Sequence, residues 1–348
     1  MLRNGRLQRA TAALCATTSA SLVGSVRAEG TNTTSSHRVD AMGRPRPMMF
    51  VRDPDAFARK WKKFSTDGIE KLVVIADFDF TLTTRFKADG GQGESTHGVL
   101  TRSEALGGSA SQISEGHFRK YYPIEQSVTL SNAEKLPYIV EWWTKEHEVL
   151  VDHKLTHQMI GRAVAKSEVA LRQGFMEIFD VLADEDVPTL IFSAGLYDVI
   201  HAVLDKEYAK TERKTLPKNV HVVSNMMRFD PTGLLVGFQG NIIHSLNKNA
   251  SVVLDTPFWK KCQLQKRENI LLLGDSLTDA TMTEGLDCSD DNIVRIGFLN
   301  DHVDERLDTY LKTFDVVLTH DSSLFPVELM LHQLDRVGPK QHDETKSS

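Results

Sequence analysis

The sequence predicts an α/β protein built around a mainly parallel sheet. Three continuous apolar runs of strand length, at 71–76, 188–192 and 269–273, lack the polar alternation of a half-exposed strand. Such runs are typical of parallel strands that are buried on both faces. Segments with helical spacing separate or follow these runs, and strands that alternate with helices favour a parallel sheet.

The expected elements begin at about residue 54, where the pattern becomes that of a folded domain. Apolar residues at helical spacing in 57–64 precede the first strand, which ends in Asp77. The stretch 230–233 (Asp-Pro-Thr-Gly) lies between two apolar runs and predicts a hairpin within 226–240. Further expected elements are weaker strands at 221–224, 293–298 and 315–318, and helices at 168–183, 197–206 and 324–334.

The interval between the first two strong strands is too long for an ordinary crossover. Residues 84–167 fill it and are mostly helical in pattern. We expect them to form a helical cap inserted above the ligand-binding edge of the sheet. The α/β core then comprises residues 47–83 and 168–337, and residues 338–348 are expected to be a polar tail.

The composition restricts the classes of function. Of 348 residues, 41% are hydrophobic and 25% are charged, which is typical of a soluble globular protein. The net charge of -6 and the lack of a basic run argue against a nucleic acid polymer as partner. No stretch approaches the ~20 apolar residues needed to cross a membrane. Cys15, Cys262 and Cys288 lack disulfide or metal spacing, so we expect a cytoplasmic protein, and we expect it to be a monomer.

The beginning of the chain differs from the rest. Residues 1–28 contain four arginines, are rich in Ala, Ser and Thr, and lack acidic residues, which suits a mitochondrial or other organellar transit peptide. A secretory signal with 12–26 as its apolar region is one alternative, and a disordered tail is another. Residues 29–46 resemble a polar linker. The segment 1–46 is therefore expected to be a disordered tail or a targeting segment.

Two aspartates, Asp77 and Asp79, directly follow the first buried strand. Carboxylates this close repel each other and are costly at a strand end unless a cation neutralises them. Mg²⁺ suits this role, because it prefers oxygen ligands and commonly combines one or two carboxylates with a substrate phosphate. An aspartate can also attack phosphorus to form an aspartyl-phosphate. A turn with two solvated aspartates is the alternative, but the strand and the following Thr81 favour a site.

Polar residues follow the other two strong strands as well. The hydroxyl of Ser193 and the backbone amides of Ala194 and Gly195 could hold phosphate oxygens, or could simply begin a helix. Asp275 and Asp279 are spaced to face one site, although Asp279 could be a first-turn helix carboxylate. Ligands of open α/β sheets bind beyond the carboxyl ends of the strands, so these groups are expected to converge.

Lys248 lies between the second and third of these motifs, within the sequence Asn-Lys-Asn. A lysine beside a phosphoryl site neutralises developing charge and keeps the nucleophile ionised. Most lysines in polar loops are only solvated. The place of Lys248 in the order of the motifs is what favours a catalytic role.

The sequence resembles the haloacid-dehalogenase-like phosphatase superfamily, whose four motifs it matches in order. The matching residues are the segment 77–81 (Asp-Phe-Asp-Phe-Thr), Ser193, Lys248, and the pair Asp275 and Asp279. The resemblance implies a Rossmann-like core with Asp77 as the nucleophile and Asp79 as the general acid and base. It also implies that Mg²⁺ is bound by the residues Asp77, Asp79 (through its backbone carbonyl), Asp275 and, through water, Asp279.

A closer resemblance extends from about residue 64 to the last helix and includes the cap. The chain is similar there to the cytosolic 5′-nucleotidases of type III, the pyrimidine nucleotidases. This implies hydrolysis of nucleoside 5′-monophosphates, such as CMP, UMP or 7-methyl-GMP. It also implies that Glu125 contacts the base and that His97 lies near it. The matching segments are 120–125, 136–145, 192–195, 221–225, 247–248 and 296–301.

The sequence departs from that family at Glu146, where a small residue is usual. A second acid near the phosphate or ribose would repel the substrate, so either Glu146 points away or the specificity has changed. The adjacent Trp142 and Trp143 could stack on a base or belong to the core. Two other functions stay open: a phosphatase for another small phosphomonoester, and a non-catalytic nucleotide-binding protein on the same scaffold.

Overall fold

The computed structural model describes residues 45–337, apart from 105, 128, 255, 257 and 260–266. The expected N-terminal tail or targeting segment lies outside the described residues as far as residue 44, and so does the expected polar tail at 338–348. None of the helices in the described part of the chain is long and apolar enough to cross a membrane.

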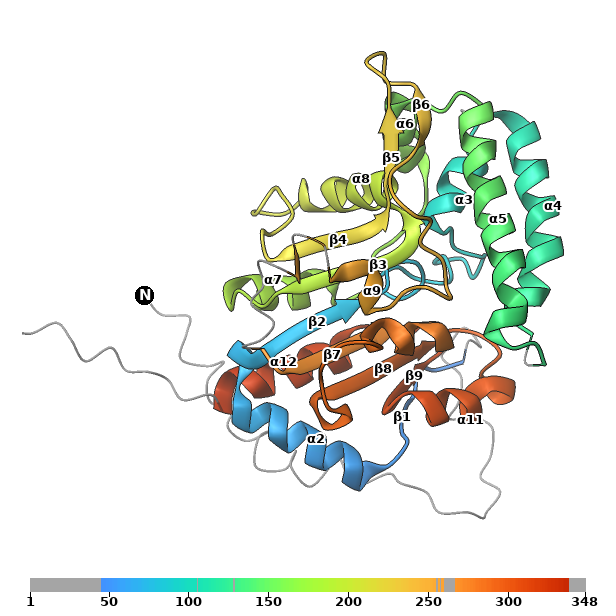
Figure 1. The fold of residues 1–348 in the computed structure, drawn as a ribbon. Coiled ribbons are helices and arrows are strands. Elements are labelled where there is room, and N and C mark those ends of the chain that lie inside the picture. Colours follow the sequence, from blue (N-terminus) through green and yellow to red (C-terminus); the bar gives the residue numbers. More distant parts are fainter. Residues whose placement is uncertain are drawn as a thin grey trace, which may run out of the picture. The chain divides into compact units, whose positions relative to one another are not determined.

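A seven-stranded sheet lies at the centre of the fold (Figure 1). Its strand order is β1-β9-β8-β7-β2-β3-β4, and every neighbouring pair is parallel except the edge pair of β1 and β9. This confirms the predicted α/β fold with a mainly parallel sheet. The strands are β1 (Met49–Val51), β2 (Leu72–Ala76), β3 (Thr189–Leu196), β4 (Val220–Asn225), β7 (Asn269–Gly274), β8 (Ile293–Leu299) and β9 (Val316–Thr319).

The strand that leads to Asp77 is an interior strand of the sheet. β2 pairs with β3 on one side and β7 on the other, and all five of its residues are buried. Its side chains alternate between two apolar clusters, so that Val74 belongs to one and Val73 to the other. The first cluster is completed by α2 (Pro54–Asp67), α7 (Phe175–Asp184), α8 (Tyr197–Tyr208) and α12 (Phe325–Val337), and the second by α11 (Val303–Thr313).

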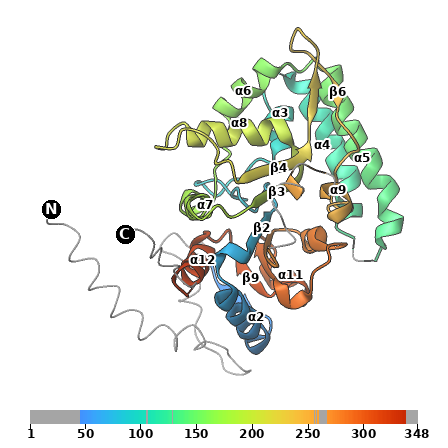
Figure 2. The ribbon, with the colours of Figure 1, turned by 60° about the vertical axis from the view of Figure 1, so that its left-hand side comes forward.

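Between β2 and α7, the described part of the chain forms four helices. They are α3 (Thr96–Thr101), α4 (Gly107–Glu125), α5 (Asn132–Asp152) and α6 (His157–Lys166). All four fall within the interval predicted for the cap, whose boundaries stay a prediction. The long helices α4 and α5 pack side by side (Figures 1 and 2). α5 begins where Ser131 and Glu134 form reciprocal side-chain bonds to each other's backbone amides.

The predicted hairpin is present as β5 (Met227–Phe229) and β6 (Leu235–Phe238). Gly233 supplies the left-handed conformation in its turn, with φ of 84°, and its amide donates to the carbonyl of Asp230 at 2.9 Å. β6 packs against α5 of the cap.

The helix expected at 168–183 begins only at Phe175. The preceding residues run along the loop that follows β2: Leu171 forms a bridge with Thr83, and the amide of Arg172 donates to the carbonyl of Leu82 at 2.8 Å. Gly174, with φ of 91°, turns the chain into the helix. A tertiary contact therefore overrides the helical periodicity of this segment.

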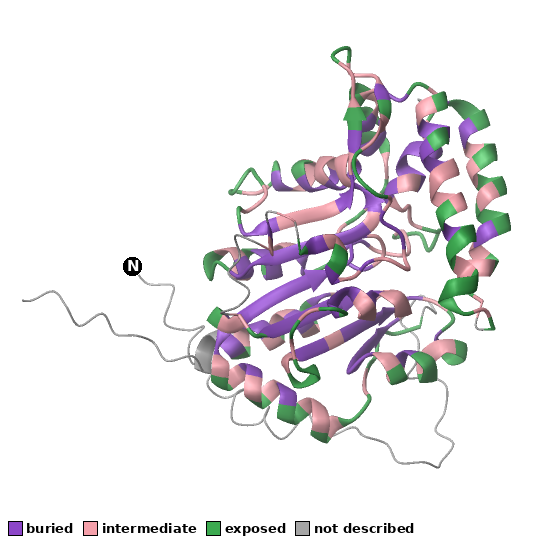
Figure 3. Ribbon diagram, in the orientation of Figure 1, coloured by how far each residue is buried: buried purple, intermediate pink, exposed green. Residues whose placement is uncertain are grey.

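Burial differs between the sheet and the cap (Figure 3). The central strands are buried along most of their length, whereas α4 and α5 carry exposed residues between the buried ones. The cap helices therefore have a polar face toward solvent and a narrower face toward the rest of the protein.

Candidate active site

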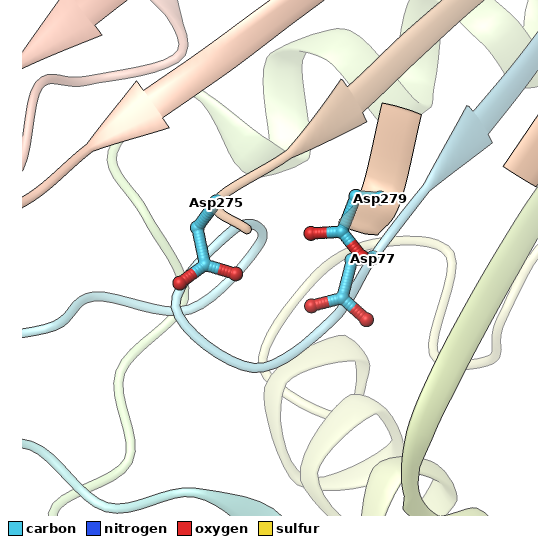
Figure 4. A group of neighbouring side chains, drawn as sticks. All are labelled: Asp77, Asp275 and Asp279. Carbon is cyan, nitrogen blue, oxygen red and sulfur yellow. The ribbon is translucent and has the colours of Figure 1, made fainter. Parts of the chain in front are cut away.

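Three carboxylates converge at the carboxyl ends of the central strands. Asp77 follows β2, Asp275 follows β7, and Asp279 lies in the 3₁₀ helix Leu277–Thr283; one oxygen from each lies within 4.8 Å of the others (Figure 4). Gly274 allows this approach, because a Cβ there would lie 2.3 Å from the Cβ of Asp279. An all-oxygen cluster of this kind suits a hard divalent cation.

Lys248 contacts two of these three carboxylates. Its Nζ lies 2.6 Å from Oδ1 of Asp77 and 2.7 Å from Oδ1 of Asp279, and the side chain is only 3% exposed. Burial alone would lower the pKa of Lys248, but attraction to Asp279 and Asp77 outweighs it and raises the pKa. Lys248 is therefore a permanent buried cation beside the carboxylate that it favours in the ionised form.

The pKa values of two of these carboxyl groups are raised by their surroundings. Burial raises the pKa of Asp77 to about 7, with Lys248 opposing the change and Asp279 adding to it. Burial and the two neighbouring carboxylates also raise the pKa of Asp275 well above its ordinary value. Keeping these buried carboxylates ionised costs free energy, and a cation bound between them would remove that cost. The residues present therefore fit a metal.

Asp79 is held by the first residue of α3. Oδ1 accepts from the backbone amide of Thr96 at 2.9 Å, and Oδ2 accepts from the Thr96 hydroxyl at 2.8 Å. Burial nevertheless raises the pKa of Asp79 to about 6. A carboxyl group with this pKa can carry or release a proton near neutral pH. Thr96 did not emerge from the sequence, because nothing in its local pattern relates it to Asp79.

Ser193, Ala194 and Gly195 lie in the last part of β3 and line a cavity that Asp77 and Asp79 also line. The amide of Gly195 donates to the Ser193 hydroxyl oxygen at 3.0 Å. A Cβ on Gly195 would lie 2.3 Å from Oγ1 of Thr96 and 3.0 Å from Oδ2 of Asp79. This glycine therefore lets β3 approach Asp79 more closely than any other residue would allow.

A buried arginine fixes the loop that follows Asp79. The guanidinium of Arg172, 1% exposed, donates to the carbonyls of Thr81 at 2.8 Å and Phe80 at 2.7 Å, and pairs with Asp321 at 2.9 Å. Phe80 adopts a left-handed conformation with φ of 63°, which a non-glycine residue keeps only when its surroundings hold it. Asn300 also donates to the Phe80 carbonyl, at 2.9 Å. Sequence reasoning missed Arg172 because it lay within a predicted helix.

A cavity of about 240 Å³ extends from Asp77 to the cap. Glu125, the last residue of α4, lines its cap end, and Oε1 of this side chain accepts from the Ser245 hydroxyl at 2.7 Å. Burial raises the pKa of Glu125, and the bond from Ser245 opposes the rise. Trp143 lines the same end, whereas Trp142 stacks on Tyr121 between α4 and α5, with ring centroids 5.9 Å apart.

His97 does not line the cavity and lies directly behind Trp143. Its ring packs edge-on against Trp143 at 4.8 Å and parallel to His147 at 6.1 Å. Burial lowers the pKa of His97 to about 3 and that of His147 to about 4, so both rings are neutral. Among the described residues, Nε2 of His97, Nε2 of His147 and Nε1 of Trp143 are buried and have no hydrogen-bond partner.

Glu146 points away from the cavity. The residue is 8% exposed, and its carboxylate contacts Nδ1 of His117 at 2.7 Å and accepts from the Ser114 hydroxyl at 2.8 Å. Both partners belong to α4, so Glu146 joins the two long cap helices. It is absent from the residues that line the cavity. The charge therefore does not face a ligand bound between Asp77 and Glu125.

Comparison with known proteins places these features in context. Residues 80–335 match the family model described as pyrimidine 5′-nucleotidase (UMPH-1). The chain is 38% identical over 267 residues to the 7-methylguanosine phosphate-specific 5′-nucleotidase of Mus musculus, covering 77% of this chain and 86% of the relative. It is 37% identical over 279 residues to the enzyme of that name from Homo sapiens, covering 78% and 90%. The crystal structure of cytosolic 5′-nucleotidase IIIB bound to cytidine aligns with a TM-score of 0.75 at 33% identity, covering 83% and 94% of the two chains.

Proposed function

Because the chain belongs to the pyrimidine 5′-nucleotidase family and is a phosphoric monoester hydrolase, we propose that it converts nucleoside 5′-monophosphates to nucleoside and phosphate with Mg²⁺ as its cofactor. The observation that carries this proposal is the placement of Asp77. It is buried beside Lys248 and two further carboxylates, at one end of a cavity whose other end is lined by Glu125 and Trp143.

The metal site is assigned to Asp77, Asp275 and the backbone carbonyl of Asp79. Both oxygens of Asp279 are already engaged, Oδ1 by Lys248 at 2.7 Å and Oδ2 by the amide of Ser276 at 2.8 Å. This favours support of the metal by Asp279 through water rather than as a direct ligand. Bound Mg²⁺ would neutralise charge on the transferring phosphoryl group.

Asp77 is the nucleophile in the proposed reaction. Its carboxylate attacks phosphorus, the bond from phosphorus to the ester oxygen breaks, and protonated Asp79 gives its proton to the departing alkoxide. The product of this step is an aspartyl-phosphate. Asp79 then takes a proton from water, which attacks the same phosphorus and releases phosphate and the Asp77 carboxylate. Lys248, Ser193 and the backbone of Ala194 and Gly195 hold the phosphoryl oxygens.

The cap end of the cavity is assigned to the base. A carboxylate such as Glu125 accepts hydrogen bonds from an amine and attracts a cationic ring. Cytosine offers an amine, and 7-methylguanine offers N–H donors and a positive charge. Trp143 lines the same end, and among the described residues its Nε1 has no hydrogen-bond partner. We therefore assign CMP and 7-methyl-GMP as substrates, with UMP the weaker.

A substrate panel tests the assignment. Purified protein is given CMP, UMP, 7-methyl-GMP, GMP and phosphoserine, each with Mg²⁺ and with EDTA, and phosphate release is measured. We expect release from CMP and 7-methyl-GMP that EDTA abolishes. Faster release from phosphoserine would favour the phosphatase of another monoester. Nucleotides that raise the melting temperature without being hydrolysed would favour a non-catalytic binding protein.

A further inference from the structure

Ser245 connects the core side of the cavity to the cap. It lies three residues before Lys248 and also lines the cavity. Its hydroxyl donates to Oε1 of Glu125 at 2.7 Å, across 120 positions of sequence. No feature of the sequence pattern relates these two residues.

The loop that carries Ser245 is held in place by side-chain bonds to its backbone. Asn225 donates to the carbonyl of Ile243 at 2.8 Å and accepts from the amide of Ile243 at 2.9 Å. Asn247 donates to the carbonyl of Ile242 at 2.8 Å and accepts from the amide of His244 at 2.8 Å. Ser245 is therefore presented to Glu125 by a fixed backbone, which makes it an effective positioning group.

The two carboxylate oxygens of Glu125 have different surroundings. Oε1 is engaged by Ser245, and Oε2 has no hydrogen-bond partner among the described residues. Lys135 donates to the backbone carbonyl of Glu125 at 2.9 Å. The side chain lines the cavity, so one acceptor is available there for a ligand.

We propose that Ser245 is a positioning residue for base selection, which holds Oε1 of Glu125 so that Oε2 accepts a hydrogen bond from an N–H group of the base. This inference rests on the proposed nucleotidase function. It favours bases that offer an amine, namely cytosine and 7-methylguanine. Uracil presents two carbonyl oxygens around its single N–H, and these would face the carboxylate unfavourably.

Nucleosides without phosphate isolate the base contact from the chemistry at Asp77. We would measure the Kd of cytidine, uridine and 7-methylguanosine by calorimetry for wild type, Ser245→Ala and Ser245→Thr. Loss of one hydrogen bond to a charged group is expected to weaken cytidine and 7-methylguanosine binding about tenfold in Ser245→Ala. Ser245→Thr retains the hydroxyl and should restore binding. Uridine affinity should change less than about twofold.

Steady-state kinetics distinguish a loss of base positioning from a general loss of activity. For the corresponding monophosphates, Ser245→Ala should raise KM about tenfold and change kcat less than about twofold, because the base contact is made before and during the reaction alike. Ser251→Ala is the matched control, since its hydroxyl bonds only locally to Asn249 at 2.6 Å and does not line the cavity. Melting temperatures establish that all variants are folded.

A double-mutant cycle with Glu125→Ala decides whether Ser245 acts through Glu125. In the Glu125→Ala background, Ser245→Ala should cause no further loss of nucleoside affinity. An equal loss in both backgrounds, unchanged affinity in the single variant, or no nucleoside binding by wild type would each overturn the proposal. Failure of wild type to release phosphate would overturn only the nucleotidase function, because nucleoside binding is measured without turnover.

Discussion

The two ends of the cavity are built in different ways. At the core end, Asp77 and Asp275 directly follow β2 and β7, and Ser193 lies within β3, so the backbone bonds of paired strands determine their positions. At the cap end, Glu125 and Trp143 lie on two helices that meet mainly through side chains. The comparison indicates that backbone pairing positions the proposed catalytic residues, while side-chain packing positions the residues proposed to contact the base. Changes to the proposed catalytic residues at the core end should therefore act on kcat, and changes to the residues proposed to contact the base on KM. Stability should depend on the buried polar contacts at both ends.

The largest expected effect is at the core end. Asp77→Asn removes the proposed nucleophile but leaves the pair of Lys248 and Asp279, 2.7 Å apart, so the fold should persist. We expect kcat for CMP to fall by about 10⁴-fold or more. Steady-state phosphate release measures kcat, and an unchanged melting temperature is the control. Residual turnover within tenfold of wild type would contradict a covalent mechanism through Asp77.

The core end was accessible to sequence reasoning because its residues occupy strand ends. The apolar run before Asp77 predicted a buried strand, and the common edge of parallel strands predicted that Ser193 and Asp275 would lie near it. Lys248 lies in a loop, and only the resemblance to phosphatases singled it out. Thr96 could not be foreseen, since its contact with Asp79 arises from the way α3 meets the sheet.

The cap was less predictable because helix packing depends on side chains from distant segments. The resemblance to nucleotidases singled out Glu125 and His97, yet only Glu125 lines the cavity. Glu146 was expected either to turn away or to alter specificity, and the structure favours the first reading because α4 supplies Ser114 and His117. No periodicity in one sequence shows which residues of α4 will face a given position of α5.

The next largest expected effect is a loss of folding stability when Arg172, at the core end, is replaced. Arg172→Met would leave Asp321 and several carbonyls without their buried donor, and loss of one partner of a buried pair costs about 3–5 kcal/mol. Urea denaturation measures the free energy of unfolding of each variant. Arg213→Met is the matched control, because Arg213 also pairs with aspartates but is 36% exposed, so a change below about 1 kcal/mol is expected. Equal losses in the two variants would show that burial of Arg172 is unimportant.

At the cap end, Glu146→Ala should have a smaller effect on stability. Ser114 and His117 would lose their shared acceptor between α4 and α5, which costs about 2 kcal/mol. Urea unfolding compares this variant with Glu148→Ala, an exposed change on the same helix that should stay within about 0.5 kcal/mol of wild type. Tighter binding of CMP at unchanged stability would instead mean that Glu146 repels the substrate, and the separation of the two ends would fail.

The smallest expected effect is a pH dependence that belongs to the cap. Burial lowers the pKa of His147 from 6.5 to about 4, so the unfolded chain binds a proton in this range and the folded chain does not. Stability contributed by neutral His147 is therefore present above pH 6.5 and is lost progressively as the pH falls toward 4. Between pH 7 and 5.5 the loss is about 1 kcal/mol. His147→Phe, which preserves the stack on Phe238, should unfold with a correspondingly flatter pH profile. Parallel profiles would mean that His147 takes up its proton at the same pH in the folded and the unfolded chain, so that burial does not lower its pKa.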